Sequence, residues 1–135
     1  ECSYNIIMST EIIGLSHLER EIIANVLRYN VRDFEYNQVQ MEANLDNISG
    51  SYGGRKDVTI LIAKLTAILR LADAMDRAHK QNLKDCKLEM KEGKLLIRTT
   101  YPGDLTLDSI SIEQKAAFFE EIFGIRPVLK RKRSV

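Results

Sequence analysis

Residues 57–80 read DVTILIAKLTAILRLADAMDRAHK and carry the strongest periodic signal in the chain. Apolar side chains recur there at steps of three and four residues, at positions Val58, Leu61, Ile62, Leu65, Ile68, Leu69, Ala72 and Met75. This spacing predicts one amphipathic helix of about six turns at ~3.6 residues per turn, with Asp57 capping its start. We expect this helix to form the core of the domain.

Two shorter helices are predicted N-terminal to this stretch. Ser16 is a good N-cap and Glu19 follows three residues later, which is the pattern of a capping box at the start of a helix that runs to about Tyr29. An irregular apolar segment at residues 3–13 favours a short helix that Gly14 ends. Residues 30–56 are mostly polar, and their Gly-, Asn- and Ser-rich second half predicts a long loop.

Beyond Lys80 the pattern changes from helical to alternating. Residues 84–90 and 95–100 predict the two strands of a hairpin, and residues 105–112 are ambiguous between strand and helix. Ser111 is predicted to cap a helix that Gly124 ends, and residues 126–129 suit a last strand. The expected fold is α+β and mainly helical, with a helical part over residues 1–82 and a small hairpin-plus-helix α+β part over residues 83–135.

Composition restricts the class of protein. The chain has 135 residues, of which 44% are hydrophobic and 29% charged, the balance of a soluble globular protein. Its net charge of +1 is too small to attract nucleic acid or a membrane over a long range. Any anion binding must therefore depend on a local group of basic side chains. Two distant cysteines give no zinc pattern, and no apolar run is long enough to span a bilayer. A cytoplasmic protein with free thiols is expected, and the start at Glu1 inside a predicted helix indicates a fragment of a longer chain.

Charged side chains gather near the end of the long predicted helix. At about 100° per residue, Asp76 falls in line with the apolar face and Asp73 at its edge, while Arg70 and Arg77 lie side by side on the flank. One interpretation is a metal or phosphate site, with carboxylates for a cation and arginines for phosphate. The alternative is a buried ionic clamp in which Asp73 pairs with the two arginines, because a buried acid is costly unless it is paired.

His79 is predicted to be half-buried, and with Asp73 and Asp76 it would make up a degenerate metal cluster. Arg55 and Lys56 follow two glycines at the start of the long helix, a weak likeness to an anion-binding helix N-terminus. A flexible loop is the simpler interpretation of the glycines.

The basic run at residues 130–133 is most simply a solvated end, with polyanion contact as the less favoured alternative. The sequence contains no GxxxxGK[ST], GxSxG or HExxH motif, so it offers no standard catalytic signature.

Five blocks of the sequence together resemble the C-terminal, HD-like helical domain of the exopolyphosphatase / guanosine-pentaphosphatase (Ppx/GppA) phosphatase family. The family patterns "HSxYxI", "GLSxxEREIIA", "RYH", "LaailRLADaLDRsH" and a closing helix are similar to residues 2–7, 14–24, 28–30, 65–79 and 118–124. The resemblance covers essentially the whole chain, and its fourth block is the most specific.

Two departures bear on chemistry. The family's histidines in the first and third blocks are Cys2 and Asn30 here, and the chain has no His-Asp dipeptide. HD enzymes hold metal with histidines and such a pair, and a catalytic metal usually needs three or more protein ligands. A working metal centre in this fragment is therefore not expected, and no cofactor is assigned to it, although a parent enzyme of this family would use Mg²⁺.

The resemblance implies a supporting role beside an actin-like N-terminal half that hydrolyses the terminal phosphate. The expected function is binding of polyphosphate or guanosine polyphosphate, with Arg55, Lys56, Arg70, Arg77 and Lys80 as phosphate contacts. The expected partners are that N-terminal half and a second copy in a homodimer, with no membrane and no sequence-specific nucleic acid. Two alternatives stay open: a degenerate HD-type metal phosphohydrolase using Asp73, Asp76 and His79, and a purely structural dimerisation domain.

Overall fold

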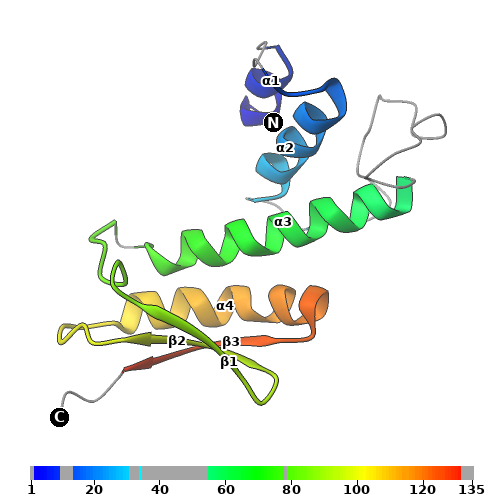
Figure 1. Cartoon of the computed structure of the whole chain (residues 1–135). Helices are drawn as coiled ribbons and strands as arrows, with labels where there is room; N and C mark the ends of the chain where they lie inside the picture. The colour runs from blue at the N-terminus through cyan, green and yellow to red at the C-terminus, as the bar shows by residue number, and fades with distance from the viewer. Residues whose placement is uncertain (1, 10–13, 31–33, 35–54, 78, 132–135) are drawn as a thin grey trace. The chain divides into compact units, whose positions relative to one another are not determined.

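The computed structural model describes residues 2–9, 14–30, 34, 55–77 and 79–131 (Figure 1). In chain order its elements are α1 (Cys2–Ser9), α2 (His17–Tyr29), α3 (Arg55–Met75), β1 (Lys87–Lys91), β2 (Lys94–Thr99), α4 (Thr106–Phe123) and β3 (Arg126–Arg131). The predicted α+β, mainly helical class is confirmed. The long loop predicted at residues 30–56 lies almost entirely outside the described residues.

The contacts divide the chain into two compact units, residues 1–66 and 67–135. This boundary lies inside α3, whereas the sequence places it after residue 82. The two divisions differ because the C-terminal part of α3 belongs to the core of the second unit, where Ala67, Leu71 and Ala74 are buried. Helical periodicity continues across the boundary and therefore gives no signal of it.

The first unit contains α1, α2 and the beginning of α3. The capping box predicted for α2 is confirmed: the Ser16 hydroxyl accepts from the Glu19 N–H at 3.1 Å, and the Glu19 carboxylate accepts from the Ser16 N–H at 3.1 Å. The guanidinium of Arg28, on α2, lies over the ring of Tyr4, on α1, with 3.8 Å to the centroid. The capping box stabilises the start of α2, and the cation–π contact joins α1 to α2.

Helix α3 ends at Met75, five residues before the predicted end. The chain then turns tightly: the Asp76 carboxylate accepts from the Gln81 N–H at 3.0 Å, and His79 and Gln81 both have φ of 55°. The prediction that Asp76 faces the core on a continuing helix is wrong, because the helix has already ended. The start also differs, since Asp57 lies in the first turn of the helix rather than at its cap.

The second unit contains a three-stranded sheet in the order β1-β2-β3. Strands β1 and β2 form the predicted antiparallel hairpin, and β3 pairs in parallel with β2 after the α4 crossover. The two turn residues, Glu92 and Gly93, have φ of 53° and 74°, the conformation of a type I′ turn whose twist matches the strands. The predicted hairpin therefore agrees with the observed pairing of β1 and β2.

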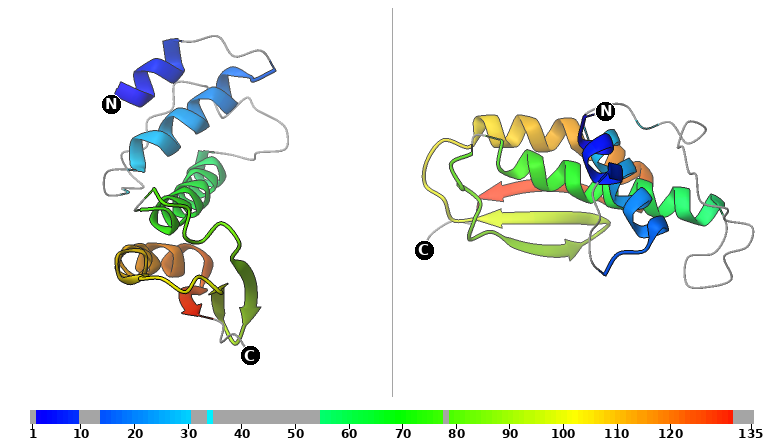
Figure 2. Two further views of the ribbon diagram at one scale, coloured as in Figure 1. Left: turned by 90° about the vertical axis from the view of Figure 1, so that its left-hand side faces the viewer. Right: turned by 90° about the horizontal axis from the view of Figure 1, so that it is seen from above.

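Helix α4 lies along one face of this sheet (Figure 2). It packs with α3 around a core of Ala67, Leu71, Ala74, Leu83, Ile97, Leu105, Ile112 and Phe119. The helix begins at Thr106, so the ambiguous segment is helical, and Ser111 is buried inside the helix rather than capping it. Gly124 ends the helix as predicted, with φ of 69° and its N–H bonded to the Glu120 carbonyl at 2.7 Å. Within the described residues, no helix combines the length and apolar character that crossing a membrane requires.

Candidate functional site

The five basic residues predicted to contact phosphate do not converge on one point. Arg55 and Lys56 occupy the first turn of α3, whereas Arg77 and Lys80 follow its C-terminal end. At ~1.5 Å rise per residue the 21 residues of α3 span about 30 Å. Arg77 and Lys80 are exposed, while Arg70 is half-buried with its guanidinium 4.6 Å from the centroid of the Phe118 ring. Arg70 therefore already has a packing role in the second unit.

The predicted acidic cluster is not assembled either. Asp73 is exposed on α3, Asp76 is half-buried in the turn described above, and His79 is exposed. The part of the chain that the structure describes contains no group of three His, Cys, Asp or Glu side chains placed to hold a metal ion.

The sheet of the second unit has two chemically different faces. Side chains alternate along each strand, and residues paired across strands share a face. Ile97 and its neighbour Leu129 face α4 and the core, and Leu88, paired with Ile97, lies on the same face. On the opposite face, Figure 2 shows no helix among the described residues of this unit. We call it the basic face, because its side chains are those of Lys87, Glu89, Lys91, Lys94, Leu96, Arg98, Arg126, Val128 and Lys130.

Six basic side chains thus share this face with one carboxylate, in a chain whose net charge is only +1. Arg98 Nε lies 2.9 Å from Glu89 Oε2, and Arg126 Nη1 lies 3.3 Å from Glu120 Oε2 at the end of α4. The four lysines make no ion pair with any described residue. The uncompensated charge of the face therefore resides in its lysines.

Leu96 shows how the face is built. It is 4% exposed in the central strand, although no described helix of this unit lies over it. Long basic side chains bury their aliphatic stems on apolar surface while their charged ends stay in water. Arg98, two residues along the same strand, is held by Glu89 at 2.9 Å and its Nε is buried, which fits a packed stem on this face.

The spacing of this face suits a chain of phosphates. Same-face residues repeat about every 6.6–6.8 Å along a strand, and strands lie about 4.8 Å apart. The lysine ammonium is a compact charge on a flexible stem. The planar guanidinium of arginine, in contrast, favours one orientation of its ligand. The residues of the face include no aromatic ring on which a base could stack. The arrangement can therefore attract an extended polyanion without reading a sequence.

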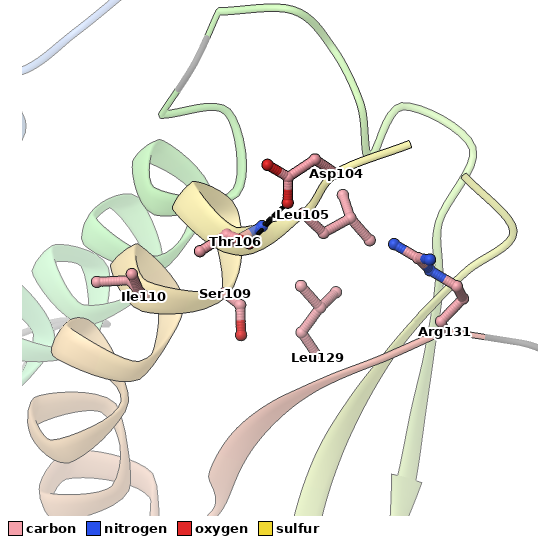
Figure 3. A pocket seen from close by; sticks show the side chains of 7 residues that line it. All are labelled: Asp104, Leu105, Thr106, Ser109, Ile110, Leu129 and Arg131. Atoms are coloured by element: carbon pink, nitrogen blue, oxygen red, sulfur yellow. Dashed lines mark hydrogen bonds between the residues drawn. The ribbon is translucent and has the colours of Figure 1, made fainter. Parts of the chain in front are cut away.

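A separate pocket of about 400 Å³ opens at the start of α4, between the helix and the end of β3 (Figure 3). Its rim includes Asp104 and Arg131, and Arg131 Nη2 donates to the Gly103 carbonyl at 2.6 Å. Hydrogen bonds from the side chain and then the backbone N–H of Thr106, with a further contribution from Arg131, lower the pKa of Asp104. Because this carboxylate already occupies the free N–H at the helix start, an anionic ligand would compete with it.

The basic face was not predicted from the sequence, although the sequence contains a signal for it. Lys87 lies in the first predicted strand and Arg98 in the second, Lys91 and Lys94 lie in the turn predicted between them, and Lys130 begins the run interpreted as a solvated end. Extending both strands by one residue to a two-residue turn places the first four on one face. Adding the last strand requires its parallel pairing with β2, which only the three-dimensional structure supplies.

Comparison of the chain with protein-family models, with curated protein sequences and with solved structures finds no match.

Proposed function

We propose that this chain is the non-catalytic C-terminal module of an exopolyphosphatase-type phosphohydrolase, and that it binds polyphosphate on the basic face. The family assignment rests on the resemblance of the five sequence blocks. The observation that supports binding is the concentration of six cations against one carboxylate on a single sheet face, over which no described helix of its own unit lies.

In this proposal hydrolysis belongs to an actin-like N-terminal half, which would also hold any Mg²⁺. The module holds the chain of phosphates by charge while the far end is cleaved elsewhere. Guanosine polyphosphate is the alternative ligand, and the cytoplasm is the proposed compartment. A degenerate HD-type phosphohydrolase is not favoured, because Asp73, Asp76 and His79 do not come together.

Two double variants test where polyphosphate binds. Lys94→Glu with Lys130→Glu reverses two charges of the basic face, and Arg77→Glu with Lys80→Glu reverses two exposed charges of the site first predicted around α3. Affinity for long-chain polyphosphate is measured by fluorescence anisotropy over a series of salt concentrations. Ion release makes the logarithm of the affinity fall linearly with the logarithm of salt, with about one unit of slope per phosphate contact.

We expect the basic-face variant to bind at least about tenfold more weakly and to lose about two units of salt slope. The α3 variant should bind like the wild-type chain. The reverse result would move the site to the end of α3. Absence of salt-sensitive binding by the wild-type chain would overturn the proposal.

A further inference from the structure

Strand β1 is an edge of the sheet, and its outer edge pairs with no strand among the described residues. All five of its residues are exposed. Leu88 and Met90 lie on the face shared with the core, opposite Ile97 and Leu95, yet they are 60% and 58% exposed. An edge strand that shows two large apolar side chains is a template for pairing with another strand.

The backbone of β1 is oriented for such pairing. The two-residue turn closes on the Lys91–Lys94 pair, and hydrogen-bonded and non-hydrogen-bonded pairs alternate along an antiparallel ladder. The N–H and C=O groups of Lys87, Glu89 and Lys91 are therefore directed at β2. Those of Leu88 and Met90 are directed at the free edge.

The sequence of this edge is complementary to itself in one antiparallel register. If Leu88 lies opposite Leu88 of a second copy, Lys87 of each copy lies opposite Glu89 of the other. The strand begins at Lys87, and Cys86 before it donates its N–H to the Leu83 carbonyl at 3.0 Å, so the match is confined to these positions. Two pairs of opposite charges then meet on one face, and the two leucines meet on the core side.

Neighbouring registers lack this match. Centring the pair on Lys87 places two lysines opposite each other. Centring it on Glu89 places two glutamates opposite each other and Lys87 opposite Lys91. Like charges directly opposite are destabilising, and any shift that exchanges odd for even positions moves the apolar side chains to the other face.

We propose that β1 pairs antiparallel with β1 of a second copy of this chain, in the register centred on Leu88. The two sheets become one of six strands, and their basic faces become continuous because residues paired across strands share a face. Five-residue strands bury little area, so the association is weak and depends on concentration. The pairing rests on β1 alone, and only its consequence for polyphosphate rests on the proposed function.

Cysteine cross-linking tests the register. In a background with Cys2 and Cys86 changed to serine, Leu88→Cys places two thiols on residues whose Cα atoms are about 5.5 Å apart, within the range for a disulfide. We expect oxidation to give a covalent dimer. Met90→Cys in the same background is the matched control. In the proposed register, position 90 of one copy lies four residues, about 14 Å, from position 90 of the other. This variant should therefore stay monomeric.

Charge exchange tests the attraction independently by sedimentation velocity at increasing protein concentration. Lys87→Glu alone and Glu89→Lys alone should each weaken the dimer at least about tenfold, because each places like charges opposite each other. The double variant should regain wild-type association, because opposite charges again meet at both positions of the interface. A wild-type chain that stays monomeric, equal cross-linking of the two cysteine variants, or a double variant weaker than both single variants would each overturn the pairing. None of these results depends on whether polyphosphate binds.

Discussion

At the scale of single residues, Asp104 shows how a fully exposed carboxyl acquires an altered acidity. Its Oδ1 accepts from the Thr106 hydroxyl at 2.6 Å and from the Thr106 N–H at 3.0 Å. These bonds favour the charged form and lower its pKa. The folded chain therefore binds fewer protons here than the unfolded chain between the lowered and the ordinary pKa. The stabilisation is complete above the ordinary pKa and is lost as the pH falls through the lowered one.

Thr106→Val should raise the pKa of Asp104 toward its usual value, because it removes the larger of the two hydrogen bonds. Thr106→Ser keeps the hydroxyl and should leave the titration unchanged. Carboxyl chemical shifts followed by NMR from neutral to acidic pH measure both. A valine variant that titrates like the wild-type chain would show that the hydroxyl is not the cause.

At the scale of secondary-structure elements, the start of α2 depends on two reciprocal hydrogen bonds between Ser16 and Glu19. Ser16→Ala removes the acceptor for the Glu19 N–H and should cost about 1 kcal/mol of unfolding free energy. Urea unfolding followed by circular dichroism measures the loss. Ser9→Ala is the matched control, since the Ser9 hydroxyl only donates to the carbonyls of Asn5 and Ile6 at the end of α1. An equal loss in the two variants would contradict a specific capping effect.

Elements whose signal is local were predictable. The capping box, the positive-φ turn at Glu92 and Gly93, and the glycine that ends α4 each follow from one or two residues and their near neighbours. The predicted end of α3 was placed five residues too far. Its periodic apolar positions stop at Met75, where the helix ends, and the chain then turns and buries Leu83 in the core of the second unit. Burial of a distant side chain outweighs a further turn of helix.

The same distinction applies to the candidate site. The Arg70–His79 segment is dense in charge and was predicted to form one helical surface, but α3 ends at Met75. The basic face was not predicted because its residues come from three strands. In the sequence, α4 separates β3 from β1 and β2. Periodicity predicts which residues of one strand share a face, but not which strands become neighbours.

At the scale of the whole molecule, α3 is shared by two units that each have their own internal contacts. The second unit buries its core among α3 from Ala67 onward, β2 and α4. A break in α3 on the first-unit side should therefore damage one unit more than the other. Lys64 is exposed and lies two residues before the boundary, so changing it disturbs the backbone without removing a buried side chain.

Lys64→Pro removes a backbone hydrogen bond inside α3 and should cost about 3 kcal/mol or more where the helix is continuous. Native-state hydrogen exchange is expected to show lost protection for the amides of α2 and the first half of α3. Amides of β2, α4 and β3 should stay protected, because Leu71, Ile97 and Phe119 keep their contacts. Lys64→Ala, which preserves the helix, should change neither set. Equal loss of protection in both sets would mean that the chain unfolds as one cooperative body, and the phosphate-binding test would then require the intact chain throughout.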